Sequence, residues 1–243
     1  MMKIVTLNTW GMSGPYETRW DYLLEELQRI QPDVICFQEV FEPTLVRKIE
    51  ECFQFSGVAS HEAGLVILTR FSISSHQDLK YQTKSPLEEY ERHALSASLT
   101  TQSGPLLVVN THLAWKPEDE KTRLNQVKEL IAAVEKKESH ALLAGDFNDT
   151  PESKPVKTIK AAGFIDLFES LHPDERGLTW DNKNPFMKEH AIKLPDRRID
   201  FLFAHKKLLA NTSPLKCEVV FNLPDKNGIY PSDHYGVVVD LET

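Results

Sequence analysis

The feature that most restricts the fold of this chain is a pattern that occurs twice, an apolar strand, an amphipathic helix and a second apolar strand. In the first copy, "IVTLNTW" precedes the helical segment "TRWDYLLEELQRI", and "DVICFQEV" follows it. In the second copy, "LLVVNTHL" precedes a helix expected over about 118–137, and "HALLAGDFND" follows it. Almost wholly apolar strands are typical of sheets covered on both faces. The repeat therefore predicts two similar sheets with helices on their outer faces.

The remaining segments fit the same plan. Helical spacing in the first helix places five apolar residues on one face, Trp20, Leu23, Leu24, Leu27 and Ile30. Further helices are expected over about 43–52 and from about Pro151 to Gly163. Closely spaced strand segments, among them "GLVILTR" and "ALSASLT", predict antiparallel pairing. The segment 170–196 is expected to be a long loop, which in a compact domain is often functional.

Length, charge and cysteine content restrict the domain number, the partners and the location that are expected for this chain. A chain of 243 residues, 41% hydrophobic, can bury a full core, so one domain over 1–243 is expected. The net charge of -8 gives no general attraction to nucleic acid or to an anionic membrane, although a local basic groove stays open. No apolar run is long enough to span a bilayer, and the start lacks the features of a secretion signal, so a cytoplasmic location is expected. Three widely spaced cysteines predict buried free thiols.

Polar residues stand at or just beyond the ends of the apolar segments. They are Asn8, Glu39, His112, Asp146, Asn148, Asp200, Asp233 and His234. Any one of them has an ordinary explanation as a turn residue or a helix cap. Their shared position is different, because loops at the ends of rigid strands commonly carry function. The set therefore predicts a functional site at one rim of the sheets.

The residue types in this set indicate the chemistry. Carboxylate and amide oxygens, without a cluster of thiolates, suit Mg²⁺ or Mn²⁺ better than zinc. Two histidines and the other carboxylates remain for proton transfer. A cation held by carboxylates and completed by phosphate oxygens is typical of phosphoester hydrolysis. The set therefore favours a metal-dependent phosphoesterase.

Six motifs in order, "LNTW", "FQEV", "NTHL", "GDFN", "RRIDFLF" and "SDHYGVVVDL", resemble those of the endonuclease/exonuclease/phosphatase superfamily, which has the DNase I-like fold. The resemblance extends from Asn8 to Leu241. It implies an α/β fold, a four-layer αββα sandwich of two mixed sheets with the active site at one rim. It also implies that Glu39 is the principal metal ligand, with Asn8 beside it, and that Asp233 approaches the metal or its water shell.

The same resemblance assigns roles in the reaction. His234 is expected to pair with Asp200, which orients the imidazole and stabilises its cationic form. Asp146 and Asn148 would position or deprotonate the attacking water and hold the phosphate. His112 would bind a non-bridging phosphate oxygen. Whether Asp146 or His234 is the base, and how many metals act, stays open, as does the oligomeric state.

The substrate is less constrained. Trp10 occupies a position that is commonly acidic or small and polar in the abasic-site endonuclease branch, whereas "NTWG" and "LTWDNKNP" resemble the neutral sphingomyelinase-like branch. Ala144 stands where the inositol polyphosphate 5-phosphatase branch has tryptophan. The leading hypothesis is thus a phosphodiesterase acting on a lipid headgroup or a small phosphodiester. The alternatives are a DNA or RNA nuclease, which is not favoured, and a non-catalytic interaction module that retains the fold.

Overall fold

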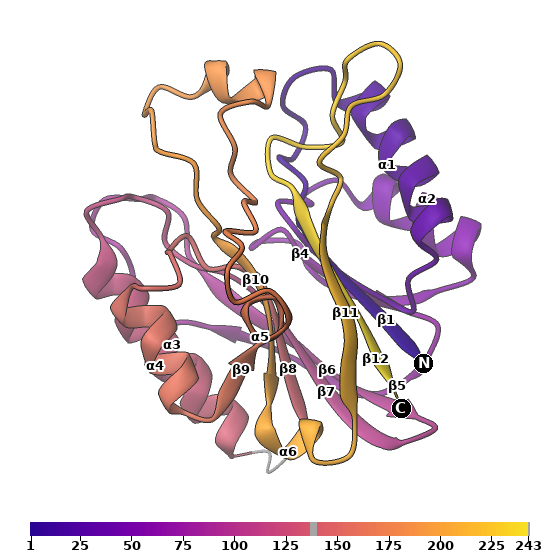
Figure 1. Cartoon of the computed structure of the whole chain (residues 1–243), viewed down its shortest axis with the longest axis vertical. Coiled ribbons are helices and arrows are strands. Elements are labelled where there is room, and N and C mark those ends of the chain that lie inside the picture. The colour runs from indigo at the N-terminus through magenta and orange to yellow at the C-terminus, as the bar shows by residue number, and fades with distance from the viewer. Residues whose placement is uncertain (137–139, 243) are drawn as a thin grey trace.

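The computed structural model describes residues 1–136 and 140–242, which contain two six-stranded sheets packed face to face (Figure 1). The first sheet has the order β11-β12-β1-β2-β4-β3, with bounds Ser213–Val220, Gly236–Glu242, Met2–Asn8, Val34–Gln38, Leu65–Thr69 and Ser56–Ser60. The second has the order β5-β6-β7-β8-β10-β9, with bounds Ser72–Lys80, His93–Thr101, Gly104–His112, Ala141–Asp146, Asp200–His205 and Phe164–Asp166.

Helices cover the outer face of each sheet, as Figure 1 shows. Helices α1 (Tyr16–Ile30) and α2 (Pro43–Phe53) pack on the first sheet, and α3 (Glu120–Glu135) and α4 (Lys154–Ala161) pack on the second. Three short helices, α5 (Leu167–Leu171), η1 (Pro185–Glu189) and α6 (Lys206–Leu209), lie in the last third of the chain. The predicted four-layer αββα sandwich is confirmed.

The repeated pattern accounts for the mixed sheets. Strands β1 and β2, joined through α1, pair in parallel, and so do β7 and β8, joined through α3, whereas the other pairings are antiparallel. All five apolar positions predicted for α1 are buried. A crossover helix must cover one face of its sheet. The 3.6-residue period in the sequence was therefore a reliable guide to this layer.

Some element boundaries differ from the predictions. Helix α4 begins at Lys154 rather than near Pro151, because the Ser153 hydroxyl accepts a hydrogen bond from the Val156 amide and caps the helix there. Helix α3 begins at Glu120, two residues later than expected, and the predicted end at Lys137 falls outside the described residues.

Cys36 and Cys217 are buried as expected, but the prediction is wrong for Cys52, which is exposed near the end of α2. Among residues 1–136 and 140–242, no helix is both long enough and apolar enough to cross a bilayer.

A pair of buried amides joins the two sheets beneath the rim. The Gln38 side chain donates to Asn110 Oδ1 at 2.7 Å, and Asn110 Nδ2 donates to the carbonyls of Phe37 and Val66 at 2.7 and 2.9 Å. Gln38 and Asn110 are both completely buried. Because these bonds run from one sheet to the other, they fix the relative position of the sheets directly below the strand ends.

Replacing Asn110 with alanine is therefore expected to lower the free energy of unfolding by about 3 kcal/mol, since the carbonyls of Phe37 and Val66 and the amide of Gln38 would lose buried partners. Urea unfolding measures the change. Asn211→Ala, at an exposed position, is the control and should change the stability by less than about 0.5 kcal/mol. If the two substitutions lowered the free energy of unfolding equally, the cross-sheet hydrogen bonds would have no specific role in stability.

Candidate active site

The rim site is built from the ends of five strands. Asn8, Gln38, His112 and Asp146 are the last residues of β1, β2, β7 and β8. Asp200 is the first residue of β10, which runs antiparallel to β8, so it lies at the same edge. The sheet register places His112 beside Asp146, and Asp146 beside Asp200. The fold thus brings residues from distant parts of the chain to one edge.

A pocket of about 350 Å³ opens at this edge. Seven of the eight residues predicted from the sequence line it, namely Asn8, Glu39, His112, Asp146, Asn148, Asp233 and His234. The eighth, Asp200, is completely buried and contacts His234. The structure therefore brings the whole predicted set together.

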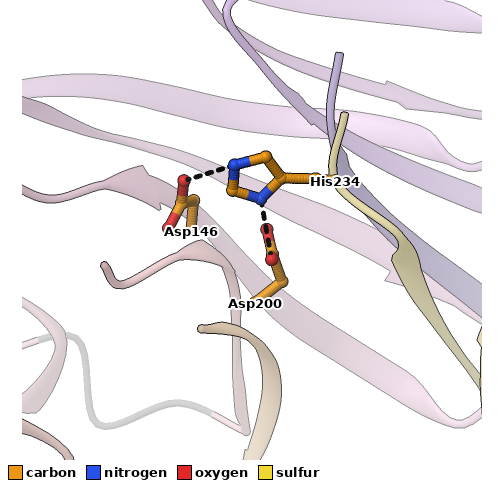
Figure 2. Close-up of side chains that lie close together, drawn as sticks. All are labelled: Asp146, Asp200 and His234. Carbon is orange, nitrogen blue, oxygen red and sulfur yellow. Dashed lines mark hydrogen bonds and ion pairs between the residues drawn. The ribbon is translucent and has the colours of Figure 1, made fainter. Parts of the chain in front are cut away.

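His234 lies between two carboxylates (Figure 2). Its Nδ1 is 3.0 Å from Asp200 Oδ2, and its Nε2 is 3.9 Å from Asp146 Oδ2. Burial alone would lower the pKa of His234, but the carboxylates of Asp200, Asp233 and Asp146 together raise that pKa well above its ordinary value. The imidazole is therefore cationic at neutral pH.

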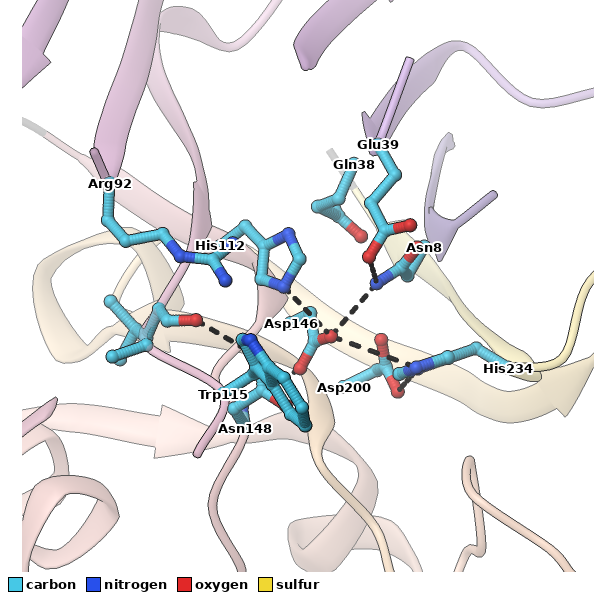
Figure 3. A network of polar contacts seen from close by, with 12 residues as sticks. Asn8, Gln38, Glu39, Arg92, His112, Trp115, Asp146, Asn148, Asp200 and His234 are labelled. Carbon is cyan, nitrogen blue, oxygen red and sulfur yellow. Dashed lines mark hydrogen bonds and ion pairs between the residues drawn. The ribbon is translucent and has the colours of Figure 1, made fainter. Parts of the chain in front are cut away.

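Asp146 is the centre of the polar network in Figure 3. Its Oδ2 accepts a hydrogen bond from Asn8 Nδ2 at 3.0 Å and lies 3.5 Å from His112 Nε2, and its Oδ1 accepts the Asn148 amide at 2.8 Å. Burial, followed by the charge of Asp200, raises the pKa of Asp146 to about 6. At neutral pH it is thus mainly a carboxylate, yet basic enough to accept a proton.

His112 differs from His234 in its charge. Burial, followed by the positive charge of Arg92, lowers the pKa of His112 well below its ordinary value. The ring is therefore neutral at pH 7. A neutral imidazole can still donate one hydrogen bond, but it adds no positive charge to the pocket.

The pKa of His234 gives a prediction about pH. In Asp200→Asn, loss of the carboxylate removes the principal attraction that stabilises the imidazolium, so the pKa of His234 falls. If activity needs the cation, the alkaline decline of kcat/KM should then move to lower pH by about one to three units. A pH–rate profile measures this shift. An alkaline limb that stays in place would show that His234 does not act as a cation held by Asp200.

The donor set on the Glu39 side fits a hard divalent cation. Glu39 lies just beyond β2, lines the pocket and accepts a hydrogen bond from Asn8 Nδ2 at 3.1 Å. Burial and then the charge of Asp233 raise its pKa, so the Glu39 carboxylate is under-compensated within the protein. Its oxygens are the donors that Mg²⁺ and Mn²⁺ prefer. Glu39, with Asn8 beside it, could therefore hold a divalent cation.

Asp233 has a different environment. Its Oδ1 accepts hydrogen bonds from the Ser232 hydroxyl at 3.0 Å and the His234 amide at 2.9 Å. Its Oδ2 is 2.8 Å from His190 Nε2. Both oxygens thus have partners in the protein, and the carboxylate anchors the segment that carries His234.

Three residues at the site have left-handed backbone conformations, with φ values of +58° for Trp10, +61° for Glu39 and +52° for Asn148. Such conformations are costly for residues other than glycine and often occur at functional sites. The turn at Trp10 has a specific effect. The Trp10 amide donates to Asn8 Oδ1 at 3.0 Å, which leaves the Asn8 amino group directed at Glu39 and Asp146.

Close packing of β7 against β8 also depends on the local sequence. Gly145 has a φ of +138°, and a Cβ atom at this position would lie 2.0 Å from the Thr111 carbonyl oxygen. Only glycine permits this approach. It allows Asp146 to reach His112 across the pair of strands.

The sequence predictions missed two residues that support the site. Arg19 is completely buried, and its guanidinium donates to four carbonyl groups, those of Thr9, Gly11, Ser13 and Pro231. It thereby holds the turn after β1 against the segment before Asp233. The sequence contained one indication of this role, because Arg19 stands four residues before Leu23 and helical spacing therefore places its charge on the buried face of the helix. His190 has no such indication, because it reaches Asp233 from an irregular loop.

The fold and the rim site define a DNase I-like αββα protein with an acidic, histidine-containing pocket. The chain belongs to the Endonuclease/Exonuclease/phosphatase family, whose model matches residues 5–234.

The chain is also similar to individual proteins. Protein angel homolog 1 of Homo sapiens is 28% identical over 167 residues, covering 55% of this chain and 25% of that protein. The 2',5'-phosphodiesterase 12 of Mus musculus is 25% identical over 294 residues, covering 94% and 47%. The chain thus spans a quarter to a half of these curated relatives. TDP2 of D. rerio, crystallised with a single-strand DNA product, has a similar fold, with a TM-score of 0.84 at 20% identity, covering 100% of this chain and 99% of that one.

Proposed function

We propose that this chain is a divalent-metal-dependent phosphodiesterase. The observation that carries the proposal is the arrangement around Asp146. A neutral histidine, His112, and an asparagine, Asn8, contact its carboxylate, and the cationic His234 lies 3.9 Å away. Glu39, whose carboxylate forms no ion pair with the residues that the structure describes, lines the same pocket. This arrangement supplies a base, a fixed positive charge and a cation ligand around a space open to substrate.

The residues have complementary roles in the proposed reaction. Asp146 accepts a proton from water as the water oxygen forms a bond to phosphorus and the bond to the leaving oxygen breaks. His234 donates a hydrogen bond from Nε2 to the phosphate group and stabilises the charge that develops there. His112 and Asn148 hold the phosphate. When bound at Glu39, Mg²⁺ or Mn²⁺ supplies further neutralisation of this charge.

Hydrolysis of bis-p-nitrophenyl phosphate tests the proposal directly, because it requires no particular group on either side of the phosphate. Activity should be present with Mg²⁺ or Mn²⁺ and should disappear with EDTA. If no phosphodiester is hydrolysed with either metal, the alternative of a non-catalytic interaction module replaces this proposal.

The substrate is a second question. The motifs "NTWG" and "LTWDNKNP" favour a lipid headgroup or a small phosphodiester as the substrate. A nuclease is the second candidate, because one similar protein is named a 2',5'-phosphodiesterase and one similar structure contains a single-strand DNA product. Phe186 and Met187 in the 170–196 segment are buried and do not form a lipid-facing patch. A panel of sphingomyelin, abasic-site duplex, single-stranded DNA, RNA and a phosphomonoester distinguishes these classes. We further propose that residues 1–243 form one catalytic domain.

A further inference from the structure

Two arginines, Arg92 and Arg197, line the pocket, and they differ in their partners. Arg92 donates from Nε and Nη2 to Glu88 Oε2, at 3.0 and 2.7 Å, and therefore has an ion-pair partner within the protein. The Arg197 guanidinium has neither a hydrogen bond nor an ion pair with any residue in the ranges 1–136 and 140–242, and its Nε is buried without a partner. The guanidinium carbon lies 5.9 Å from the centroid of the Trp180 ring.

The two charged residues on either side of Arg197 in the sequence, Asp196 and Arg198, have other partners. Asp196 Oδ1 accepts the backbone and side-chain nitrogens of Asn182 at 2.9 and 2.7 Å. Arg198 pairs with both oxygens of Asp166 at 2.9 and 2.7 Å. Of the three consecutive charged residues Asp196, Arg197 and Arg198, Arg197 is thus the one that lines the pocket.

The position of Arg197 is well defined. Its backbone amide and carbonyl both bond to Trp180 at 2.9 Å, and its carbonyl also accepts the Thr179 amide at 3.1 Å. Burial lowers the pKa of the guanidinium and the charge of Asp146, which lines the same pocket, raises it, so the group stays cationic at neutral pH. A half-buried cation that has no direct hydrogen bond or ion pair among the described residues favours an anionic ligand.

In the proposed reaction, other groups of the site already neutralise the charge of the scissile phosphate. A phosphodiester carries one negative charge, which the His234 imidazolium and a cation at Glu39 would meet. We infer that Arg197 binds a second phosphate, adjacent to the scissile one, and so selects substrates that carry it. This inference rests on the proposed function and names its substrate class. It also disfavours choline headgroups, because a quaternary ammonium beside Arg197 would be repelled.

Matched substrates test the inference. Dithymidylate is compared with the same dinucleotide carrying a 5'- or a 3'-phosphate, and glycerophosphoinositol is compared with glycerophosphoinositol 4-phosphate. For one of these pairs, kcat/KM of the native chain should be about 10-fold to 100-fold higher with the second phosphate. The dinucleotide and inositol arms distinguish a nucleic-acid source of that phosphate from a lipid-headgroup source. Glycerophosphocholine should be the poorest diester.

Substitution of Arg197 assigns the preference to that side chain. Arg197→Met should reduce the ratio of the two kcat/KM values to near one, and Arg197→Lys should restore part of it. Arg47→Met, which removes the same charge from an exposed site on α2, should leave the ratio unchanged. Far-UV circular dichroism verifies that each variant folds. If the native chain shows no preference in any pair, or if Arg197→Met lowers both members equally, the inference is wrong.

A binding measurement separates this inference from the proposed function. Fluorescence titration with the dinucleotides in EDTA, where no hydrolysis occurs, should show tighter binding of the phosphorylated form that depends on Arg197. Hydrolysis of bis-p-nitrophenyl phosphate without this binding preference would leave the proposed function intact and overturn the inference. The reverse result would retain the second-phosphate site and overturn the enzymatic proposal.

Discussion

Replacing His234 with alanine is expected to lower kcat for bis-p-nitrophenyl phosphate by about 10³-fold, with no recovery when Mg²⁺ is raised. The reason is that the substitution removes the imidazolium held 3.0 Å from Asp200 and leaves Asp146 and Asp200 without their shared cation. A metal bound near Glu39 cannot replace a hydrogen-bond donor at that position. Steady-state kinetics over a range of Mg²⁺ concentrations measure both effects.

The control for this experiment is His76→Ala, at an exposed position on β5 outside the pocket, which should leave kcat unchanged. Circular dichroism and thermal unfolding establish that the His234 variant still folds. Near-native turnover by a folded His234→Ala protein would remove this residue from the proposed reaction.

Replacing Glu39 with glutamine should have the second largest effect, and one of a different kind. Loss of the carboxylate removes the proposed principal cation ligand, so the Mg²⁺ concentration at half-maximal activity should rise by about 100-fold, and part of the activity should return at high Mg²⁺. Mn²⁺ binding, followed by electron paramagnetic resonance without substrate, should weaken in parallel.

Glu62→Gln provides a matched control, because Glu62 lines the same pocket but is exposed. It should leave the metal dependence unchanged. If the Glu39 and Glu62 variants shift the metal dependence equally, the cation is attracted by the general negative charge of the pocket and not by Glu39.

The sequence predicted the layers and the membership of the rim site for a physical reason. Parallel strands linked by a helix end at the same edge of a sheet, so polar residues at their ends converge, as His112 and Asp146 do on neighbouring strands. Asn8 and Asp146, 138 positions apart in the sequence, belong to different sheets and meet because the two sheets pack face to face. The short strands β3 and β9 escaped prediction because they are brief and their pairing depends on neighbours distant in sequence.

The parts of the site that could not be predicted depend on partners rather than on patterns. His190 reaches Asp233 from a loop, and no periodicity specifies where an irregular segment folds back. The sequence also could not show that Arg197 lacks an ion pair. That property depends on where the fold places Asn182, which bonds to Asp196, and Asp166, which pairs with Arg198. Charge alone does not reveal whether a side chain is already neutralised.

The division of the site between the two sheets has a consequence for how the site is assembled. Glu39 and Asn8 belong to one sheet, and Asp146 and His112 belong to the other, with the amide pair of Gln38 and Asn110 between them. Neither half of the chain contains both the proposed cation ligand and the proposed base. The site therefore forms only when the sheets dock in register, so that catalytic competence would be among the last properties acquired during folding.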